Sequence, residues 1–403
     1  MRTAVVTLML VLLGVAPAQA TPGGHSAPQY YLNQWHAARL WAAGVTGHGI
    51  TIAEIDTGVD ADDGVFAGRL VTGTDFGSLG GDGRTDRDRN PYGHGTSMAS
   101  IMVGRPGRLG IRGLAPGARL MPVAIPIDGT TDAAPNDHLA DAIRWAADHG
   151  ARIISLSLTG VSRRAAACPA DEQQAVFEAL RRGVLVFAAS GNSGPRDRAP
   201  EDPGSCLGVV SVGAVNRRGA VARFSSRHRY LTLTAPGVNV ASIGPGGRPF
   251  AGNGTSQATA LASAAAALVW SARPALTASQ VLARLIATTD RRSQRPSAAY
   301  GFGVVNAYRA VTAHVPKNAP DPVYALARRF LPGAAQRRIP RPPAVSTAAA
   351  APGRYAVRTP SAPSHTATIV WAVLAGVGLL GLIALLVHFW RSRSGIRARS
   401  AKT

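Results

Sequence analysis

Three short motifs carry residue types that together could perform hydrolysis. Asp56 ends an apolar run, His94 lies between two glycines, and Ser256 follows Gly254-Thr255 at the start of an alanine-rich run. A serine hydroxyl becomes a strong nucleophile only when a neighbouring base accepts its proton. Each motif alone has a plainer explanation, namely a turn after a strand, an ordinary histidine and a helix N-cap. The combination of all three favours nucleophilic catalysis.

A fourth motif could supply part of an oxyanion site. Residues 188–192 read Ala-Ala-Ser-Gly-Asn, an apolar strand that ends in Gly191-Asn192. The Asn192 amide could donate a hydrogen bond to a developing oxyanion. The backbone N–H of Ser256, at a helix N-terminus, could supply a second donor, because the helix dipole favours negative charge there.

The elements that must position these residues alternate between strands and helices. We expect strands at 49–55, 151–158, 183–189 and 209–215, and helices at 139–149, 172–182, 256–270 and 277–288. Alternation at this spacing predicts an α/β fold with a mainly parallel sheet and helices on both faces. Ligands of open α/β sheets bind at the carboxyl edge, where Asp56 is expected to lie.

The motifs and their order resemble the subtilases and, among them, the mycosins, the membrane-anchored peptidases associated with type VII secretion in actinobacteria. The resemblance covers about Tyr31 to Val311. Its carriers are Gln34-Trp35, Thr51–Asp60, Gly93–Thr96, Gly113–Ala118, Ser190–Asn192, Ala235–Gly237, Gly254–Ser256 and Gly301–Ala307. It implies a three-layer αβα fold and a serine endopeptidase acting through an acyl-enzyme. Asp56 would orient His94, His94 would be the general base, Ser256 the nucleophile and Asn192 an oxyanion donor.

The same resemblance implies where a protein or peptide substrate binds. A substrate would add as an extra β-strand beside residues 155–158, with main-chain hydrogen bonds providing affinity and pockets providing specificity. The implied substrate-binding residues are Ser155, Leu156, Ser157, Leu158, Gly160, Ala189 and Gly191.

Four residues depart from the usual family pattern. Gln257 stands where a methionine or aromatic residue is usual, and Ala260 replaces a proline. Ser100 replaces a common glycine and Thr234 an acidic or small residue. None removes a catalytic atom, but they leave a second function open, in which the chain is a structural subunit that stabilises a membrane secretion complex.

The chain ends predict export and anchoring. Residues 1–20 resemble a signal peptide that is cleaved after Ala18-Gln19-Ala20; an uncleaved anchor is the alternative. The catalytic domain is expected over 21–313 and a Pro-rich linker over 314–365. Residues 366–390 contain no charged side chain and suit a transmembrane helix, since about 20 apolar residues span a bilayer. The basic tail, 391–403, would be cytoplasmic, so the protein would be a single-pass cell-membrane protein with an extracytoplasmic domain.

The remaining composition limits the partners. The formal net charge of +21 comes from arginine-rich usage of the kind a GC-rich genome imposes, and no nucleic-acid-binding motif accompanies it. We expect no nucleic-acid partner, no cofactor and no metal, and we interpret the acidic residues of 60–63 and 82–88 as solvated loops. Export permits a disulfide between Cys168 and Cys206, with two buried thiols as the alternative. Type VII membrane components are the expected assembly partners.

Overall fold

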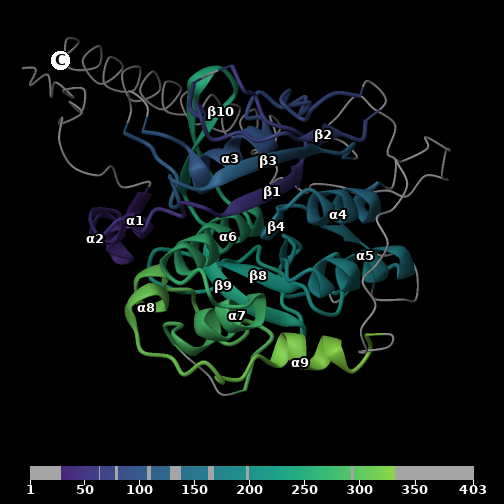
Figure 1. Ribbon diagram of the computed structural model, residues 1–403, viewed down its shortest axis with the longest axis vertical. Coiled ribbons are helices and arrows are strands. Elements are labelled where there is room, and N and C mark those ends of the chain that lie inside the picture. The colour runs from purple at the N-terminus through teal and green to yellow at the C-terminus, as the bar shows by residue number, and fades with distance from the viewer. Residues whose placement is uncertain are drawn as a thin grey trace, which may run out of the picture.

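The computed structural model describes residues 29–331, except for residues 63, 78–79, 107–109, 128–137, 162–167, 197–198 and 292–294. Its centre is a sheet in which all neighbouring strands are parallel (Figure 1). The strands, in spatial order, are β2 (Thr74–Asp75), β3 (Arg119–Ala124), β1 (Thr51–Asp56), β4 (Ile153–Leu156), β6 (Leu185–Ala189), β8 (Val210–Val215) and β9 (Leu231–Pro236). The predicted α/β class and parallel sheet are confirmed.

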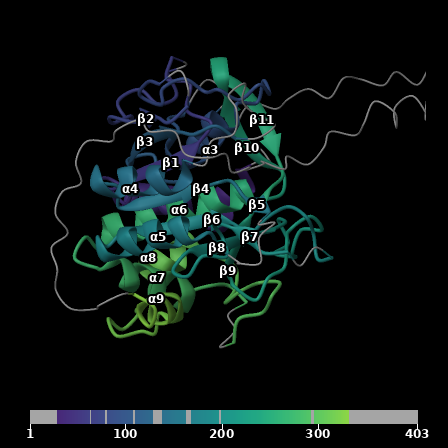
Figure 2. The ribbon, with the colours of Figure 1, turned by 90° about the vertical axis from the view of Figure 1, so that its right-hand side faces the viewer.

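Helices cover the sheet in two groups. Helices α4 (Leu139–Asp148) and α5 (Ala170–Arg181) lie side by side on one face (Figures 1 and 2). The other group consists of α3 (His94–Val103) and α6 (Thr255–Ala272), which pack against each other. Every residue of α6 from Thr255 to Trp270 is buried, because its many alanines let sheet and neighbouring helices approach from all sides. Two further helices, α7 (Ala278–Ala287) and α8 (Ala307–Thr312), pack against α6.

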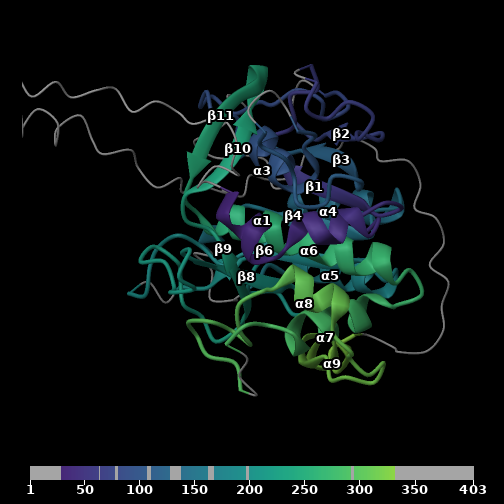
Figure 3. The same ribbon diagram turned by 90° about the vertical axis from the view of Figure 1, so that its left-hand side faces the viewer.

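Several short elements were not expected from the sequence. Two small helices, α1 (Tyr30–Gln34) and α2 (Ala37–Ala42), precede β1. The antiparallel pair β10 (Val240–Gly244) and β11 (Arg248–Gly252) projects from the domain as a hairpin (Figure 3). A second antiparallel pair joins β5 (Gly160–Val161) to β7 (Glu201–Asp202). Such two-residue strands carry too little periodicity to be recognised from a sequence.

The first part of the expected linker is folded, so the domain boundary at 313 was placed too early. Helix α9 (Pro322–Arg328) begins at an Asp321 cap, whose side chain accepts a hydrogen bond from Tyr324 N. The Tyr324 ring is buried and its hydroxyl donates to the Val184 carbonyl at 2.8 Å. Proline at the first helical position favours a helix here, which the Pro-rich composition concealed.

The predicted signal peptide, membrane span and tail lie outside the described residues. Within residues 29–331, no helix combines the length and the apolar composition needed to cross a bilayer. The disulfide prediction, in contrast, is confirmed. Cys168 and Cys206 are bridged, with Cα atoms 5.1 Å apart, and they join the segment before α5 to the turn before β8.

Candidate active site

The predicted aspartate and histidine form a buried pair. Asp56 is the last residue of β1 and His94 the first of α3. His94 Nδ1 lies 2.7 Å from Asp56 Oδ1 and 2.9 Å from Oδ2. The glycine after the histidine is needed for this approach, because a Cβ at Gly95 would collide with the carbonyl oxygen of Gly58. The imidazole is therefore fixed with Nε2 directed away from the carboxylate.

The surroundings of His94 favour its protonated form. Burial alone would lower the pKa of His94, but the charge and hydrogen bond of Asp56 outweigh it, and Asp88 and Asp86 add to the effect. The pKa of His94 is therefore raised above 6.5. A base of raised pKa accepts a proton more readily, which suits a group that must take the proton of a serine hydroxyl.

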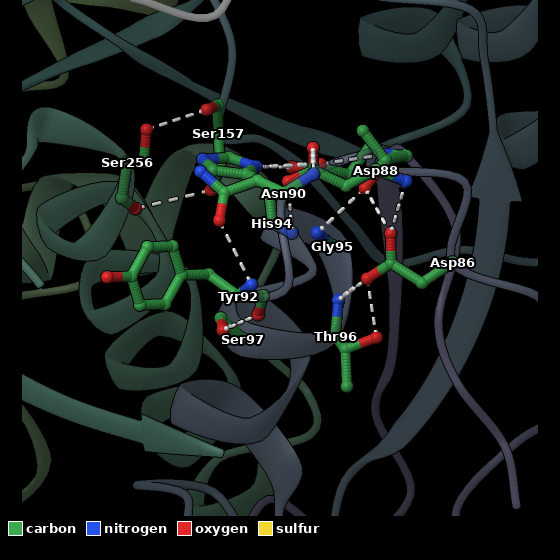
Figure 4. Close-up of polar contacts among 12 residues, drawn as sticks. Asp86, Asp88, Asn90, Tyr92, His94, Gly95, Thr96, Ser97, Ser157 and Ser256 are labelled. Atoms are coloured by element: carbon green, nitrogen blue, oxygen red, sulfur yellow. Dashed lines mark hydrogen bonds and ion pairs between the residues drawn. The ribbon is translucent and has the colours of Figure 1, made fainter. Parts of the chain in front are cut away.

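Two aspartates that the sequence analysis assigned to a solvated loop hold the start of α3 in place. Asp88 Oδ2 accepts the His94 N–H at 2.9 Å. Asp86 accepts the Thr96 N–H at 2.8 Å and the Thr57 hydroxyl at 2.8 Å (Figure 4). Burial raises the pKa of both carboxyl groups. The loop interpretation holds for the exposed Asp62 and Asp82 but was wrong for these two.

The predicted nucleophile lies at the start of α6, with its hydroxyl turned toward β4. Ser256 Oγ donates to the Ser157 carbonyl at 2.8 Å, and Ser157 Oγ donates to the Ser256 carbonyl at 3.2 Å (Figure 4). The Ser256 hydroxyl proton is thus held by Ser157 and not by His94. The structure places Ser256 at the expected helix start, but it does not join the serine to the Asp56–His94 pair by a hydrogen bond.

Asn192 is held beside the nucleophile. Its Oδ1 accepts hydrogen bonds from the Thr255 N–H at 2.9 Å and the Thr255 hydroxyl at 3.1 Å. An amide whose oxygen is held in this way presents its NH₂ group on the opposite side. The preceding residue has φ +103°, a conformation that favours glycine, and Gly191 N donates to the Thr255 hydroxyl at 3.3 Å. Asn192 and Ser256 are therefore coupled through one residue, Thr255.

The expected substrate strand is only partly available. The backbone at Ser155 is paired on both sides, with Glu54 of β1 and Phe187 of β6, so no substrate can pair with it. The Ser155 hydroxyl accepts a hydrogen bond from Ser263 of α6 at 3.1 Å, inside the core. Leu156 is fully buried and ends the strand. The assignment of Ser155 and Leu156 as substrate-binding residues was wrong, because the sheet extends to the end of β4.

The other implied substrate residues lie at or beyond the carboxyl ends of β4 and β6. Ser157 and Leu158 follow β4, and Gly160 begins β5. Ala189 ends β6, and Gly191 comes two residues later. Because β4 and β6 are parallel neighbours, the segments 157–160 and 189–191 leave the sheet side by side. Ser157 is hydrogen-bonded to Ser256, and Gly191 directly precedes Asn192, so both segments lie next to the nucleophile and the oxyanion residue.

The profile of the subtilase family, Peptidase_S8, matches residues 47–303. The chain belongs to the subtilase family. Subtilisin amylosacchariticus from Bacillus subtilis subsp. amylosacchariticus is 32% identical over 287 residues, which cover 70% of each chain. Subtilisin Savinase from Lederbergia lenta is 34% identical over 293 residues, or 73% of this chain and 99% of that protein. The family consists of serine endopeptidases, and this chain is one of them.

Solved structures of mycosins are similar as well. MycP3 protease from the type VII (ESX-3) secretion system is 30% identical with a TM-score of 0.61, and the match covers 73% of this chain and 90% of that one. MycP1 from Mycobacterium smegmatis is 26% identical with a TM-score of 0.62, over 75% and 89% of the two chains. The resemblance to mycosins noted from the sequence is confirmed.

This subtilase has a cavity of about 270 Å³ beside His94, on the side of the β10–β11 hairpin. Tyr92 and Phe250 line it with rings in edge-to-face contact, 4.4 Å between centroids. Gln257 also lines it, and its side-chain amide packs tightly against Gly252. The departure at Gln257 therefore shapes this cavity and leaves the Asp56–His94 contact intact.

One buried carboxyl near the catalytic pair was missed in the sequence. Glu54 lies two residues before Asp56 on β1 and is 1% exposed. Neither of its carboxylate oxygens has a hydrogen-bond partner among the described residues. Burial raises the pKa of Glu54 well above 4.5, and Asp56 and Asp86 raise it further. A glutamate inside an apolar strand run was the signal that could have identified it.

Proposed function

We propose that this subtilase cleaves protein substrates with Asp56, His94 and Ser256 as its triad, outside the cell and anchored to the membrane. The observation that carries the proposal is the buried contact of His94 Nδ1 with both oxygens of Asp56, at 2.7 and 2.9 Å. This contact fixes the tautomer that leaves Nε2 as the proton acceptor. It also stabilises the imidazolium that forms when the nucleophile loses its proton.

The proposed reaction begins when the Ser256 hydroxyl leaves the Ser157 carbonyl. Ser256 Oγ turns from the Ser157 carbonyl to His94 Nε2, transfers its proton and attacks the scissile carbonyl carbon. The Ser256 N–H and the Asn192 amide then donate hydrogen bonds to the oxyanion. Both groups lie at the N-terminus of α6, where Asn192 is hydrogen-bonded to Thr255. His94 next protonates the leaving amine, and a water molecule activated by His94 hydrolyses the acyl-enzyme.

A serine-directed fluorophosphonate tests this assignment without a known substrate. We expect labelling of the wild type and of a Ser271→Ala control, which changes a serine at the far end of α6. Ser256→Ala and His94→Ala should not be labelled, because the first lacks the nucleophile and the second its base. Equal labelling of Ser256→Ala would show that another residue is the nucleophile.

A structural role is the second candidate. Two observations favour it. The Ser256 hydroxyl is hydrogen-bonded to the Ser157 carbonyl and not to His94, and the chain is similar to a protease from a type VII secretion system. In this case the chain would stabilise membrane components of a secretion complex. A chromosomal Ser256→Ala strain decides between the two. Loss of secretion would support a catalytic requirement, and normal secretion in that strain but not in a deletion strain would support the structural role.

The proposed membrane topology is inferred from the sequence alone. The uncharged segment 366–390 is followed by five basic residues, so the domain would face outward and the tail inward. Protease added to intact spheroplasts should cut between 332 and 365 and release the domain, while a tag after Thr403 stays protected. Release of that tag from intact spheroplasts would contradict this topology.

A further inference from the structure

The small β5–β7 sheet brings an acidic residue to the end of the pocket beside Ser256. The family resemblance implies that a substrate side chain enters between residues 157–160 and residues 189–191; we call these segments the two walls of the primary pocket. The first wall runs directly into β5, and β5 pairs with β7 through Gly160–Asp202 and Val161–Glu201. Strand β7 therefore lies beside the end of the first wall and carries Glu201 there.

Contact with the second wall fixes the position of the Glu201 carboxyl group. A Cβ at Gly191 would collide with Glu201 Cδ and both carboxylate oxygens. The carboxyl group thus lies against the Cα of Gly191, one residue before Asn192. Glycine is required at 191 both by its positive φ and by this neighbour. A side chain that enters between the walls from the Ser256 side must approach this carboxylate.

The Glu201 carboxyl group is held in place rather than free to leave the pocket. Glu201 is 2% exposed, and its Oε1 accepts the Ser226 hydroxyl at 2.8 Å. Ser226 in turn donates its backbone N–H to the Gly191 carbonyl at 2.9 Å. The Glu201 N–H donates to the Tyr230 hydroxyl at 2.9 Å. Among the described residues no hydrogen bond reaches Oε2, so one oxygen remains available to an incoming donor.

The Glu201 carboxyl group makes one ion-pair contact within the described residues. Within the described part of the chain, the one basic group at ion-pair distance is His228 Nε2, which is 4.0 Å from Oε1. The His228 ring is stacked on Tyr230 at 4.6 Å and makes no hydrogen bond through Nε2 in the described residues. A histidine adds positive charge only when it is protonated. The described residues therefore place no arginine or lysine at ion-pair distance from the Glu201 carboxyl group.

We propose that Glu201 makes this subtilase select arginine or lysine as the substrate residue before the scissile bond. The proposal rests on the proposed peptidase function and names its substrate class. A guanidinium or ammonium group would donate to Oε2 and neutralise a buried charge. A large apolar side chain would desolvate the carboxylate without pairing it, and an acidic one would be repelled.

A peptide library in which only this residue varies tests the selectivity at pH 8.5. For the full-length wild type we expect kcat/KM to be roughly 100-fold higher for arginine and lysine than for norleucine. Glu201→Gln keeps the shape and should remove or invert this preference. Glu201→Asp keeps the charge and should retain a preference for cations. Glu178→Gln, the same change on α5, is the matched control and should leave the preference unchanged.

Binding to inactive protein separates this inference from the proposed function. Ser256→Ala should bind a fluorescent arginine peptide at least about 10-fold more tightly than its norleucine analogue, and Ser256→Ala with Glu201→Gln should not. Fluorophosphonate labelling of the wild type and of Glu178→Gln reports an active nucleophile independently of Glu201. Labelling with an unchanged library preference would overturn the role of Glu201 alone. A Glu201-dependent binding preference without labelling would overturn the peptidase function alone.

Discussion

The aspartate–histidine half of the active site and the serine half differ in how completely they are assembled. His94 is held by Asp56 on its ring and by Asp88 on its backbone, and Asp86 ties the same helix start to Thr57. Ser256 has its backbone at the start of α6, but its hydroxyl is bonded to Ser157. The first half is supported by a closed network, whereas the serine of the second half is not hydrogen-bonded to His94. In the proposed mechanism, the Ser256 hydroxyl must therefore leave Ser157 before His94 can accept its proton.

Removal of the Asp56 charge from the aspartate–histidine half should have the largest effect on activity. Asp56→Asn leaves the geometry but supports the wrong imidazole tautomer, so kcat should fall about 10⁴-fold. Fluorophosphonate labelling should slow in parallel. Asp141→Asn, on the exposed surface of α4, is the control and should keep full activity. A decrease of less than about 10-fold on Asp56→Asn would mean that the buried pair is structural.

Removal of the oxyanion donor tests the serine half. Asn192→Ala should lower kcat by about 10²- to 10³-fold with little change in KM, since the amide acts on charge that develops in the transition state. Asn306→Ala, which removes the cap of α8 instead, should affect stability more than kcat. An effect of Asn192→Ala confined to KM would place the amide in substrate binding.

Glu54, which lies two residues before Asp56 on β1, is a buried group that should destabilise the aspartate–histidine half of the site. Glu54→Leu should raise the free energy of unfolding at pH 8 by about 1–3 kcal/mol, the cost of a buried polar group without a hydrogen bond. The raised pKa of Glu54 determines whether the wild type becomes more or less stable as the pH rises. Below pH 4.5 both states are protonated, and as the pH rises the unfolded chain loses its proton first, so wild-type stability falls.

Thermal melts of wild type and Glu54→Leu at pH 5 and pH 8 measure this difference. The gain of the variant should be larger at pH 8 than at pH 5. Glu178→Leu, on α5, should show no such dependence. An identical pH dependence in wild type and Glu54→Leu would mean that Glu54 gains a partner in solution.

The smallest effect is expected from Asp88→Asn. The amide oxygen can still accept the His94 N–H, but the negative charge that raises the pKa of His94 is lost. Because the base must be neutral, the acidic limb of the kcat/KM profile should move to lower pH. The plateau should change by less than about fivefold, equivalent to about 1 kcal/mol. A shift toward higher pH would contradict the assigned electrostatics.

Local patterns in the sequence identified Asp56, His94, Ser256 and Asn192. An apolar run that ends in an aspartate, a histidine between glycines and a serine before a run of alanines are each read within a few residues. The backbone rules behind them act over the same range, namely strand burial, glycine conformations and helix starts. The same rules placed strands β1, β4, β6 and β8 and helices α4, α5, α6 and α7 within a few residues of their observed ends, but they did not identify β2, β3 and β9 of the same sheet.

The buried acidic residues around the catalytic residues became apparent only in the folded structure. Asp86 and Asp88 read as a charged loop until the fold placed α3 against them, and Glu54 read as part of a strand. Glu201 lies next to Gly191 because two-residue strands pair across a gap of about 40 residues, Gly160 with Asp202. Such contacts form between segments that are far apart in the chain. They therefore leave no periodic pattern and no short motif in the sequence. Local residue patterns thus indicate which side chains could perform the chemistry, whereas long-range packing sets the charges that surround them.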